Sequence, residues 1–159
     1  MVFNQDFREF IELLNENEVD YLIVGGYALA VHGIPRYTQD IDFWIRTNQK
    51  NIKKILKVLK DFGFASIDLK EEDFLDKDNV IQLGYPPNRI DLLSEIDGVV
   101  FDEAFKERTI IEIEGLKVNF INFRDLKKNK EASGRLQDLA DLEKLNKIEE
   151  KEKDKDHST

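Results

Sequence analysis

A four-residue apolar run near the N-terminus places the strongest constraint on the fold of this chain. Tyr21–Val24 has no break in its apolar character, and two glycines, Gly25 and Gly26, end it. A strand with one wet face alternates apolar and polar residues, whereas a continuous apolar run is expected of a strand buried on both faces. The run therefore predicts a sheet that other elements cover on both sides.

Helical and strand patterns elsewhere in the chain supply the elements for such a sheet. Helices are predicted from apolar residues at three- and four-residue spacing over 4–17, 27–32, 47 or 48 to 61, 101–107, 121–130 and 132–148. Strands are predicted over 40–46, 64–69, 80–83 and 89–93, with a hairpin over 109–113 and 116–120 and an irregular or briefly helical stretch over 71–79. This order of elements predicts an α/β (α+β) fold, a mixed β-sheet with helices packed on it.

The composition suits a single folded domain, which we place at residues 1–148. The chain has 159 residues, of which 41% are hydrophobic, and this is enough to bury a sizeable core. The last segment is nearly all Glu, Lys and Asp, so a disordered charged tail is predicted over 149–159. The absence of cysteine excludes disulfides, thiolate catalysis and zinc sites built on sulfur.

The net charge and the lack of targeting segments limit which binding partners and which cellular compartment we expect. The net charge of −9 argues against a protein that grips nucleic acid over a broad basic surface, although it leaves a local basic groove open. No apolar run approaches the ~20 residues of a membrane span. The N-terminus lacks the basic and apolar regions of a signal peptide. We therefore expect a cytoplasmic protein with no membrane contact.

Two aspartates interrupt a strand in which Ile, Phe and Trp are the favoured residues. Strand alternation puts Asp40 and Asp42 on one face, ~7 Å apart, where they repel each other unless a cation lies near. Asp91 interrupts another apolar strand and is the best third carboxylate. Oxygen ligands without His or Cys favour Mg²⁺ or Mn²⁺. The alternative is that these aspartates simply face solvent.

The glycine pair offers a second site feature. Gly25 and Gly26 lie where a strand turns into a helix, so the backbone there can approach a ligand closely and its N–H groups favour an anion such as phosphate. The segment is neither a Walker A loop nor a dinucleotide fingerprint, because the Lys-Ser/Thr pair and the third glycine are missing. A plain tight turn is the alternative.

Taken together, these motifs resemble the nucleotidyltransferase superfamily with the DNA polymerase β-like fold. The shared pattern is Gly25-Gly26, thirteen intervening residues, Asp40-Ile41-Asp42, and later Asp91. It is most similar to small bacterial nucleotidyltransferases, which include relatives of abortive-infection toxins. The segment 130–141, a lysine followed by Gly-Arg-x-x-Asp-x-x-Asp, resembles their C-terminal helix.

The resemblance implies transfer of an NMP from an NTP to a hydroxyl-type acceptor, with release of pyrophosphate. It implies that the three aspartates hold Mg²⁺ or Mn²⁺, that Asp91 helps to deprotonate the acceptor, and that the glycines cradle the triphosphate. Further candidates for the nucleotide site are Arg36, Thr38, Lys130 and Arg135. The alternatives are pairing with a surface acid for Arg36, a structural hydroxyl for Thr38, and a solvated helix face for the last two.

The sequence does not identify the acceptor of the nucleotide. RNA ends such as those of tRNA, proteins and small molecules such as aminoglycosides all fit the resemblance, and the charge of −9 disfavours long RNA. A different class of function is also compatible with the sequence. A catalytically silent nucleotidyltransferase fold could act as a binding module, such as a toxin–antitoxin partner that covers a basic protein.

Overall fold

The computed structural model describes residues 1–64 and 68–157 and contains a six-stranded mixed sheet of order β3-β4-β2-β1-β6-β5. The strands are β1 (Tyr21–Val24), β2 (Asp40–Ile45), β3 (Val80–Leu83), β4 (Arg89–Leu93), β5 (Thr109–Ile113) and β6 (Leu116–Phe120). β1 runs antiparallel to β2 and parallel to β6, while β2 runs parallel to β4. The predicted mixed sheet is confirmed.

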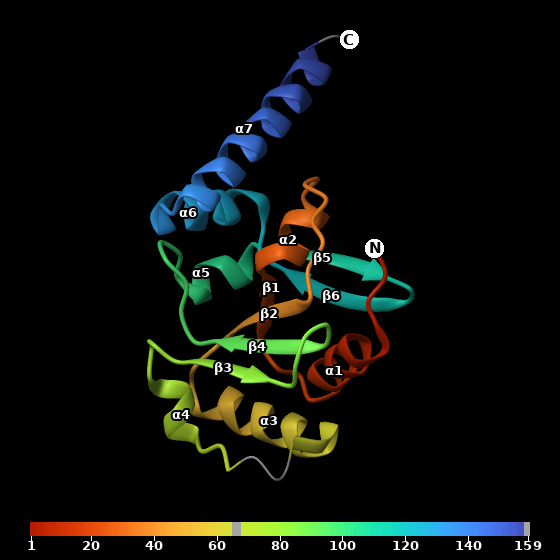
Figure 1. The fold of residues 1–159 in the computed structure, drawn as a ribbon, viewed down its shortest axis with the longest axis vertical. Helices are drawn as coiled ribbons and strands as arrows, with labels where there is room; N and C mark the ends of the chain where they lie inside the picture. Colours follow the sequence, from red (N-terminus) through yellow and green to blue (C-terminus); the bar gives the residue numbers. More distant parts are fainter. Residues whose placement is uncertain (65–67, 158–159) are drawn as a thin grey trace.

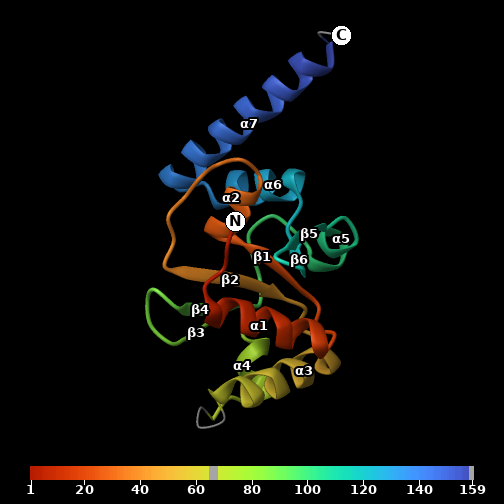
Figure 2. The same cartoon turned by 90° about the vertical axis from the view of Figure 1, so that its right-hand side faces the viewer.

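Helices cover the sheet from both sides (Figures 1 and 2). They are α1 (Gln5–Glu16), α2 (Gly25–Val31), α3 (Gln49–Leu59), α4 (Glu71–Leu75), α5 (Phe101–Lys106), α6 (Phe123–Ser133) and α7 (Leu136–His157), with a π-helical turn η1 (Lys60–Phe64) after α3. Figure 2 shows α1, α3 and α4 on one side of the sheet and α2 and α6 on the other, with α7 extending away from the body. Within the described residues, no helix combines the length and apolar character that crossing a membrane requires.

The core lies between the sheet and these helices. All four residues of β1 are buried, which confirms the two-sided burial predicted from its continuous apolar run. α1 begins at a side-chain cap, because Asn4 Oδ1 accepts a hydrogen bond from the Phe7 N–H at 2.8 Å. The same helix buries Phe10, whose ring centroid lies 5.3 Å from that of Phe43 on β2. Full burial of such a side chain contributes about 1.5–3 kcal/mol.

Strand register decides which polar side chains meet. In the antiparallel pairing of β1 with β2, Val24 lies opposite Asp42. In the parallel pairing of β2 with β4, Asp42 lies beside Asp91, and Asp40 lies beside Arg89. The end of β1, the start of α2 and the acidic positions of β2 and β4 therefore converge on one place.

The break between the last two helices lies further along the chain than predicted. α6 continues to Ser133, and Gly134 then adopts a left-handed conformation with φ 65°. Glycine adopts this conformation without a Cβ penalty and is therefore the common residue just past a helix end. The predicted helices over 121–130 and 132–148 are replaced by α6 and α7, which are divided by this glycine.

Two further segments differ from their predicted form or stay untested. The structure describes α7 as helical to His157, and the disorder predicted from Glu149 stays a prediction. Glu149 ties this segment down by accepting a hydrogen bond from Lys127 of α6 at 2.9 Å and by pairing with Lys153 one turn later. The strand predicted over 64–69 includes residues 65–67, which lie outside the described part, and Phe64 ends the η1 turn instead.

Candidate active site

Three aspartates from two neighbouring strands form a cluster. Asp40 and Asp42 come from β2 and Asp91 comes from β4, and each offers a carboxylate oxygen within 4.8 Å of the others. Alternation along β2 puts the first two on the same face. The parallel register then places Asp91 beside them. The structure thus brings together the three carboxylates that the sequence singled out.

Two side chains hold parts of this cluster by hydrogen bonds. Thr38 Oγ1 lies 2.7 Å from Asp40 Oδ1 and orders that carboxylate from the preceding loop. Arg89 donates from Nη2 to Asp40 Oδ2 at 2.7 Å. Its Nε donates to Asp91 Oδ1 at 2.9 Å, and its Nη2 also donates to Asp91 Oδ2 at 3.1 Å. Thr38 thus makes a hydrogen bond within the protein, while its predicted contact with the nucleotide stays a prediction, and Arg89 is an unpredicted member of the site.

Asp42 differs from its two neighbours because it is short of positive charge. Within residues 1–64 and 68–157, no cationic side chain donates a hydrogen bond to it. Burial, followed by the charges of Asp40 and Asp91, raises the Asp42 pKa from 3.8 to about 7. The Arg89 charge opposes this rise without cancelling it. An added cation beside the cluster would favour the ionised form of Asp42 and lower this pKa again.

The donor set fits a hard divalent cation. All three ligands are carboxylates, which Mg²⁺ and Mn²⁺ prefer. One guanidinium against three carboxylates leaves a formal excess of two negative charges. The residues present therefore match a divalent ion in both ligand chemistry and charge.

Gly25 allows the backbone to lie against the cluster. Its φ is +70°, and a Cβ added to it would overlap Asp42 Oδ2. Gly26 is less constrained, because a Cβ there would lie 3.3 Å from the Thr38 Cβ. The first glycine is thus required by the close approach of strand end and carboxylate, and a phosphate contact by either glycine stays a prediction.

Replacing Gly25 with Ala is expected to lower the free energy of unfolding by roughly 2–4 kcal/mol, since it adds a steric overlap to left-handed strain. Gly115→Ala is the matched control, because Gly115 has φ +80° but nothing within 4 Å of its added Cβ. We expect the control to lose only about 1 kcal/mol. Urea unfolding measures both values, and equal losses would show that contact with Asp42 is not what requires Gly25.

A cleft of about 310 Å³ opens beside the cluster. Gly25 and Asp42 line it together with Lys130 and Ser133 of α6 and with Arg135, which precedes α7. Four of the residues predicted for the site, from opposite ends of the chain, therefore share one cavity. Three further acids also line it, Glu95, Asp97 and Asp138, so a polyphosphate bound there would need the charge of a metal ion in addition to the two basic side chains.

Comparison with known families decides the assignment. Residues 5–154 match the family described as nucleotidyltransferase of unknown function (DUF6036). The chain belongs to this nucleotidyltransferase family. The resemblance inferred from the glycine pair and the aspartates is confirmed at the level of the family. A comparison with curated protein sequences finds no match.

Solved structures share the fold at low sequence identity. Lincosamide antibiotic adenylyltransferase LnuA, solved with lincomycin bound, superposes with a TM-score of 0.60 at 14% identity over 92% of this chain and 98% of its own. A predicted nucleotidyltransferase from Thermotoga maritima gives 0.57 at 16% identity, with 91% of each chain covered. An antigenic nucleotidyltransferase-like protein from Paracoccidioides brasiliensis gives 0.52 at 15%, over 88% of this chain and 74% of its own. At these identities the likeness shows the fold.

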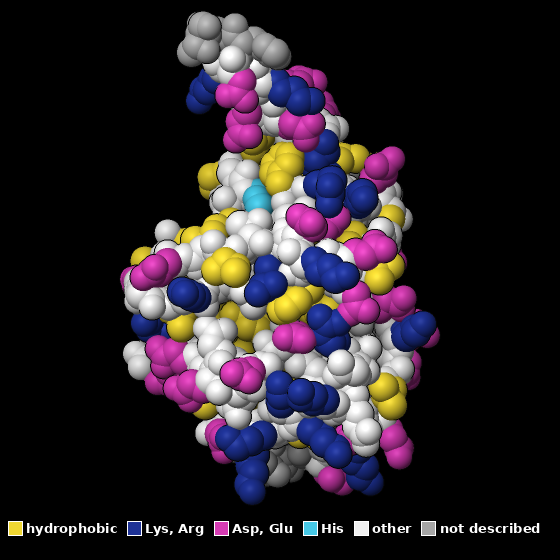
Figure 3. All heavy atoms as spheres, turned by 180° about the vertical axis from the view of Figure 1, so that it is seen from behind, with side chains coloured by type: hydrophobic (Ala, Val, Ile, Leu, Met, Phe, Trp, Pro, Cys, Tyr) yellow, Lys and Arg dark blue, Asp and Glu magenta, His cyan; other side chains and the backbone are white. Residues whose placement is uncertain are grey.

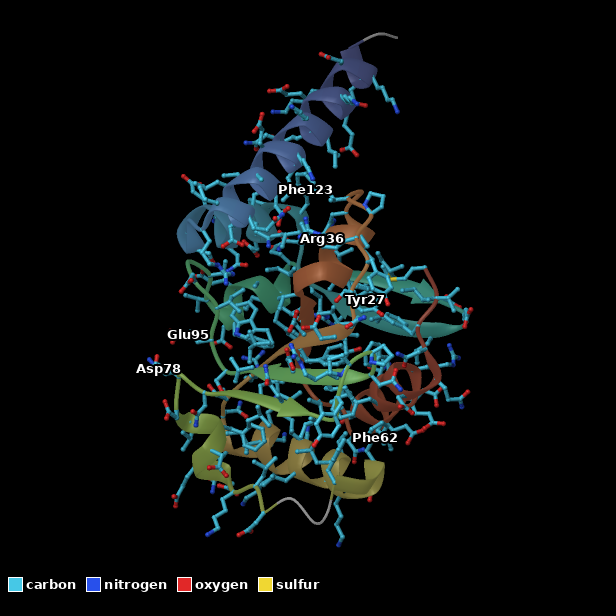
Figure 4. All side chains as sticks on the ribbon, in the orientation of Figure 1. Tyr27, Arg36, Phe62, Asp78, Glu95 and Phe123 are labelled. Atoms are coloured by element: carbon cyan, nitrogen blue, oxygen red, sulfur yellow. The ribbon has the colours of Figure 1, made fainter. Side chains whose placement is uncertain are left out.

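An ion network behind the cleft ties the loop before β2 to the last two helices of this nucleotidyltransferase. Arg36, labelled in Figure 4, donates two hydrogen bonds to Asp141 of α7, at 3.0 and 2.5 Å. Asp141 is fully buried, so Arg36 pairs with an interior acid rather than a surface one. Lys130 Nζ lies 3.3 Å from both Asp138 Oδ1 and Asp141 Oδ2.

The two basic residues of the cleft differ in their freedom to reach a ligand. The Lys130 side chain is 11% exposed and held in two ion pairs, so a solvated helix face is the wrong description of it. The Arg135 side chain donates from Nε to Asp138 at 2.7 Å yet stays 80% exposed. Arg135 can therefore turn toward a bound phosphate more easily than Lys130, whose charge acts from a fixed position.

A second cleft, of about 390 Å³, lies beside Asp40. Tyr37, Gln39 and Pro86 line it together with Thr38, Asp40 and Arg89. Tyr37 is 84% exposed, although large aromatic side chains usually bury their area. Asp42 therefore lines one cavity, and Asp40 lines another that has an exposed aromatic ring.

Sequence reasoning missed two interactions of this site. Arg89 could have been found, because it precedes Asp91 by two positions and so shares its strand face. The pairing of Arg36 with Asp141 carried no local signal, since 105 residues separate them.

Proposed function

We propose that this nucleotidyltransferase transfers an NMP from an NTP to a hydroxyl of a small-molecule acceptor in a reaction that depends on Mg²⁺ or Mn²⁺. The observation that carries the proposal is the cluster of three carboxylates within 4.8 Å, of which Asp42 lines a cleft together with Lys130 and Arg135. Membership of a nucleotidyltransferase family supports the class of reaction.

Each residue has a role that follows from its position. Asp40, Asp42 and Asp91 hold the divalent ion, which when bound activates the attacking oxygen and neutralises charge on the phosphates. In this proposal Gly25, whose backbone lies against Asp42, would let the nucleotide phosphates approach closely, and Arg135, which lines the same cleft, would pair with them. The acceptor oxygen forms a bond to the α-phosphorus while the bond from that phosphorus to the pyrophosphate oxygen breaks. The hydroxyl proton passes to Asp91.

The second cleft suits the acceptor. It shares Asp40 with the carboxylate cluster, whereas the first cleft contains Asp42, so a hydroxyl placed there would lie beside a different aspartate from the one that faces the nucleotide. Its volume fits a small ring-bearing molecule, which Tyr37 would contact. The lincomycin-bound structure of LnuA supports a small acceptor by analogy of fold. Figure 3 shows acidic and basic side chains mixed over the face turned away in Figure 1, and a face of this kind is not a basic track for RNA.

The test is transfer of label from each α-³²P-labelled NTP with Mg²⁺ or Mn²⁺. Small hydroxylated compounds including lincomycin, tRNA and a protein mixture are offered as separate acceptors. We expect label on a small molecule, its loss in EDTA, and a fall of at least about 100-fold in Asp40→Asn. Asp102→Asn, which alters an exposed acid of α5, is the control.

Two outcomes would contradict the proposal. One is transfer that persists without metal, and the other is transfer that is undiminished in Asp40→Asn. If no acceptor is labelled and the biological activity survives replacement of both Asp40 and Asp42, the chain acts as the silent binding module considered from its sequence.

A further inference from the structure

We propose that Arg89 is a built-in competitor of the divalent ion: it bridges Asp40 and Asp91 when metal is absent and must leave them when metal binds. The inference rests on the proposed metal site and adds a residue that controls its occupancy. Arg89 is a positioning residue in this role, because it acts through the carboxylates.

The placement of Arg89 follows from the sheet. It precedes Asp91 by two residues on β4, so both side chains project from the same face. The parallel register pairs it with Asp40 of β2. Its guanidinium therefore reaches across both strands, as the contacts at 2.7, 2.9 and 3.1 Å record.

These contacts use the oxygens that a metal would need. Arg89 donates hydrogen bonds to Oδ2 of Asp40 and to both oxygens of Asp91. The Thr38 hydroxyl donates to the remaining oxygen of Asp40, Oδ1. All four oxygens of these two carboxylates thus have a hydrogen-bond partner. Among the described residues, Asp42 is the one aspartate of the cluster that accepts no hydrogen bond from a cationic side chain. Arg89 thus already occupies a lone pair on three of the oxygens that an ion held by all three aspartates would share.

Electrostatic repulsion opposes an arrangement in which Arg89 and the divalent ion contact the same carboxylates. A guanidinium and a divalent ion on the same carboxylate oxygens would lie within a few ångströms of each other and repel. Arg89 also has space to move, because its side chain is 28% exposed and lines the second cleft. Metal binding would therefore transfer a positive charge from the carboxylates toward the cleft that contains Tyr37.

The experiment measures Mn²⁺ binding alone, without nucleotide, by calorimetry and by the EPR signal of free Mn²⁺. We expect Arg89→Gln to bind Mn²⁺ at least tenfold more tightly than the wild type, because the competing charge is gone. Arg89→Lys keeps the charge but loses the bidentate contact with Asp91, so we expect its Mn²⁺ affinity to lie between those of the wild type and Arg89→Gln. Arg46→Gln is the matched control, since Arg46 also contacts two acids, Asp20 and Asp102, but far from the cluster, and we expect no change.

Thermal unfolding in EDTA gives a second readout. Arg89→Gln should unfold at a lower temperature than the wild type, because three carboxylates then repel without a counter-charge, and Mn²⁺ should raise its melting temperature more than it raises that of the wild type. If Arg89→Gln binds Mn²⁺ with equal or lower affinity, the inference is wrong and Arg89 is a clamp that preorganises the ligands.

The failure of this inference differs from the failure of the proposed function. Equal Mn²⁺ affinities in an enzyme that transfers label in a metal-dependent way overturn only the role of Arg89. Absence of Mn²⁺ binding in the wild type and in both Arg89 variants overturns the metal site and the inference together. Tighter Mn²⁺ binding by Arg89→Gln than by the wild type supports the inference.

Discussion

Asp42→Asn is expected to abolish nucleotidyl transfer and, at the same time, to make the metal-free protein more stable. The substitution removes a ligand of the proposed metal site, so we expect a loss of at least about 1,000-fold in the transfer rate. It also removes a charge that is buried beside Asp40 and Asp91. Label transfer measures the first effect, and urea unfolding in EDTA measures the second.

The gain in stability should depend on pH with a defined sign. The folded-state pKa of Asp42 is raised by burial and by its neighbours from 3.8 to about 7. A raised pKa means that the native state is favoured fully below pH ~4 and loses this advantage as pH rises toward 7. The Asn variant avoids that loss, so we expect it to exceed the wild type by about 1–3 kcal/mol at pH 8 and to match it near pH 4.

In excess Mg²⁺ we expect the wild type to be more stable than Asp42→Asn, because only the wild type has all three carboxylates to bind the ion. Asp102→Asn is the control and should leave both transfer and the pH dependence unchanged, since Asp102 is an exposed residue of α5. Retention of transfer by Asp42→Asn would refute the catalytic role, and equal stability at pH 8 would refute the electrostatic one.

Asp141→Ala is expected to cost about 3–5 kcal/mol of stability, the largest loss that we predict for a single side chain. Asp141 is fully buried and accepts two hydrogen bonds from Arg36. It also pairs with Lys130, whose side chain is only 11% exposed. Truncation leaves these buried or half-buried charges without their partner. Urea unfolding at neutral pH measures the loss.

Low pH should lower the free energy of unfolding of the wild type through protonation of Asp141. Burial alone would raise the pKa of Asp141, but hydrogen bonds from Arg36, Gln137 and Lys130 outweigh it and lower the pKa from 3.8 to about 2. Its contribution is therefore complete above pH ~4 and disappears as pH falls toward 2. Glu143→Gln is the control on the same helix, because Glu143 is 71% exposed, and we expect a change within about 0.5 kcal/mol. A comparable loss in the control would show that α7 is sensitive to any change of charge.

Local patterns predicted the elements that position the site. The continuous apolar run of β1 predicted its two-sided burial, and the Asn4 cap with helically spaced apolar residues predicted α1. These signals succeed because burial and capping of a short element depend on residues that are neighbours in the chain. The disorder predicted for the tail from its composition stays a prediction, although Glu149 pairs with Lys127 and Lys153 along the helix that the structure describes there.

The sequence by itself determined which residues can supply the chemistry. Strand alternation placed Asp40 and Asp42 on one face, and the absence of cysteine left oxygen as the ligand type. Only the tertiary structure decided that Asp91 and Arg89 lie beside them, because the register of two parallel strands depends on packing between segments far apart in the chain. The same holds for Arg36 and Asp141, whose pairing across 105 residues arises only once α7 packs behind the cleft.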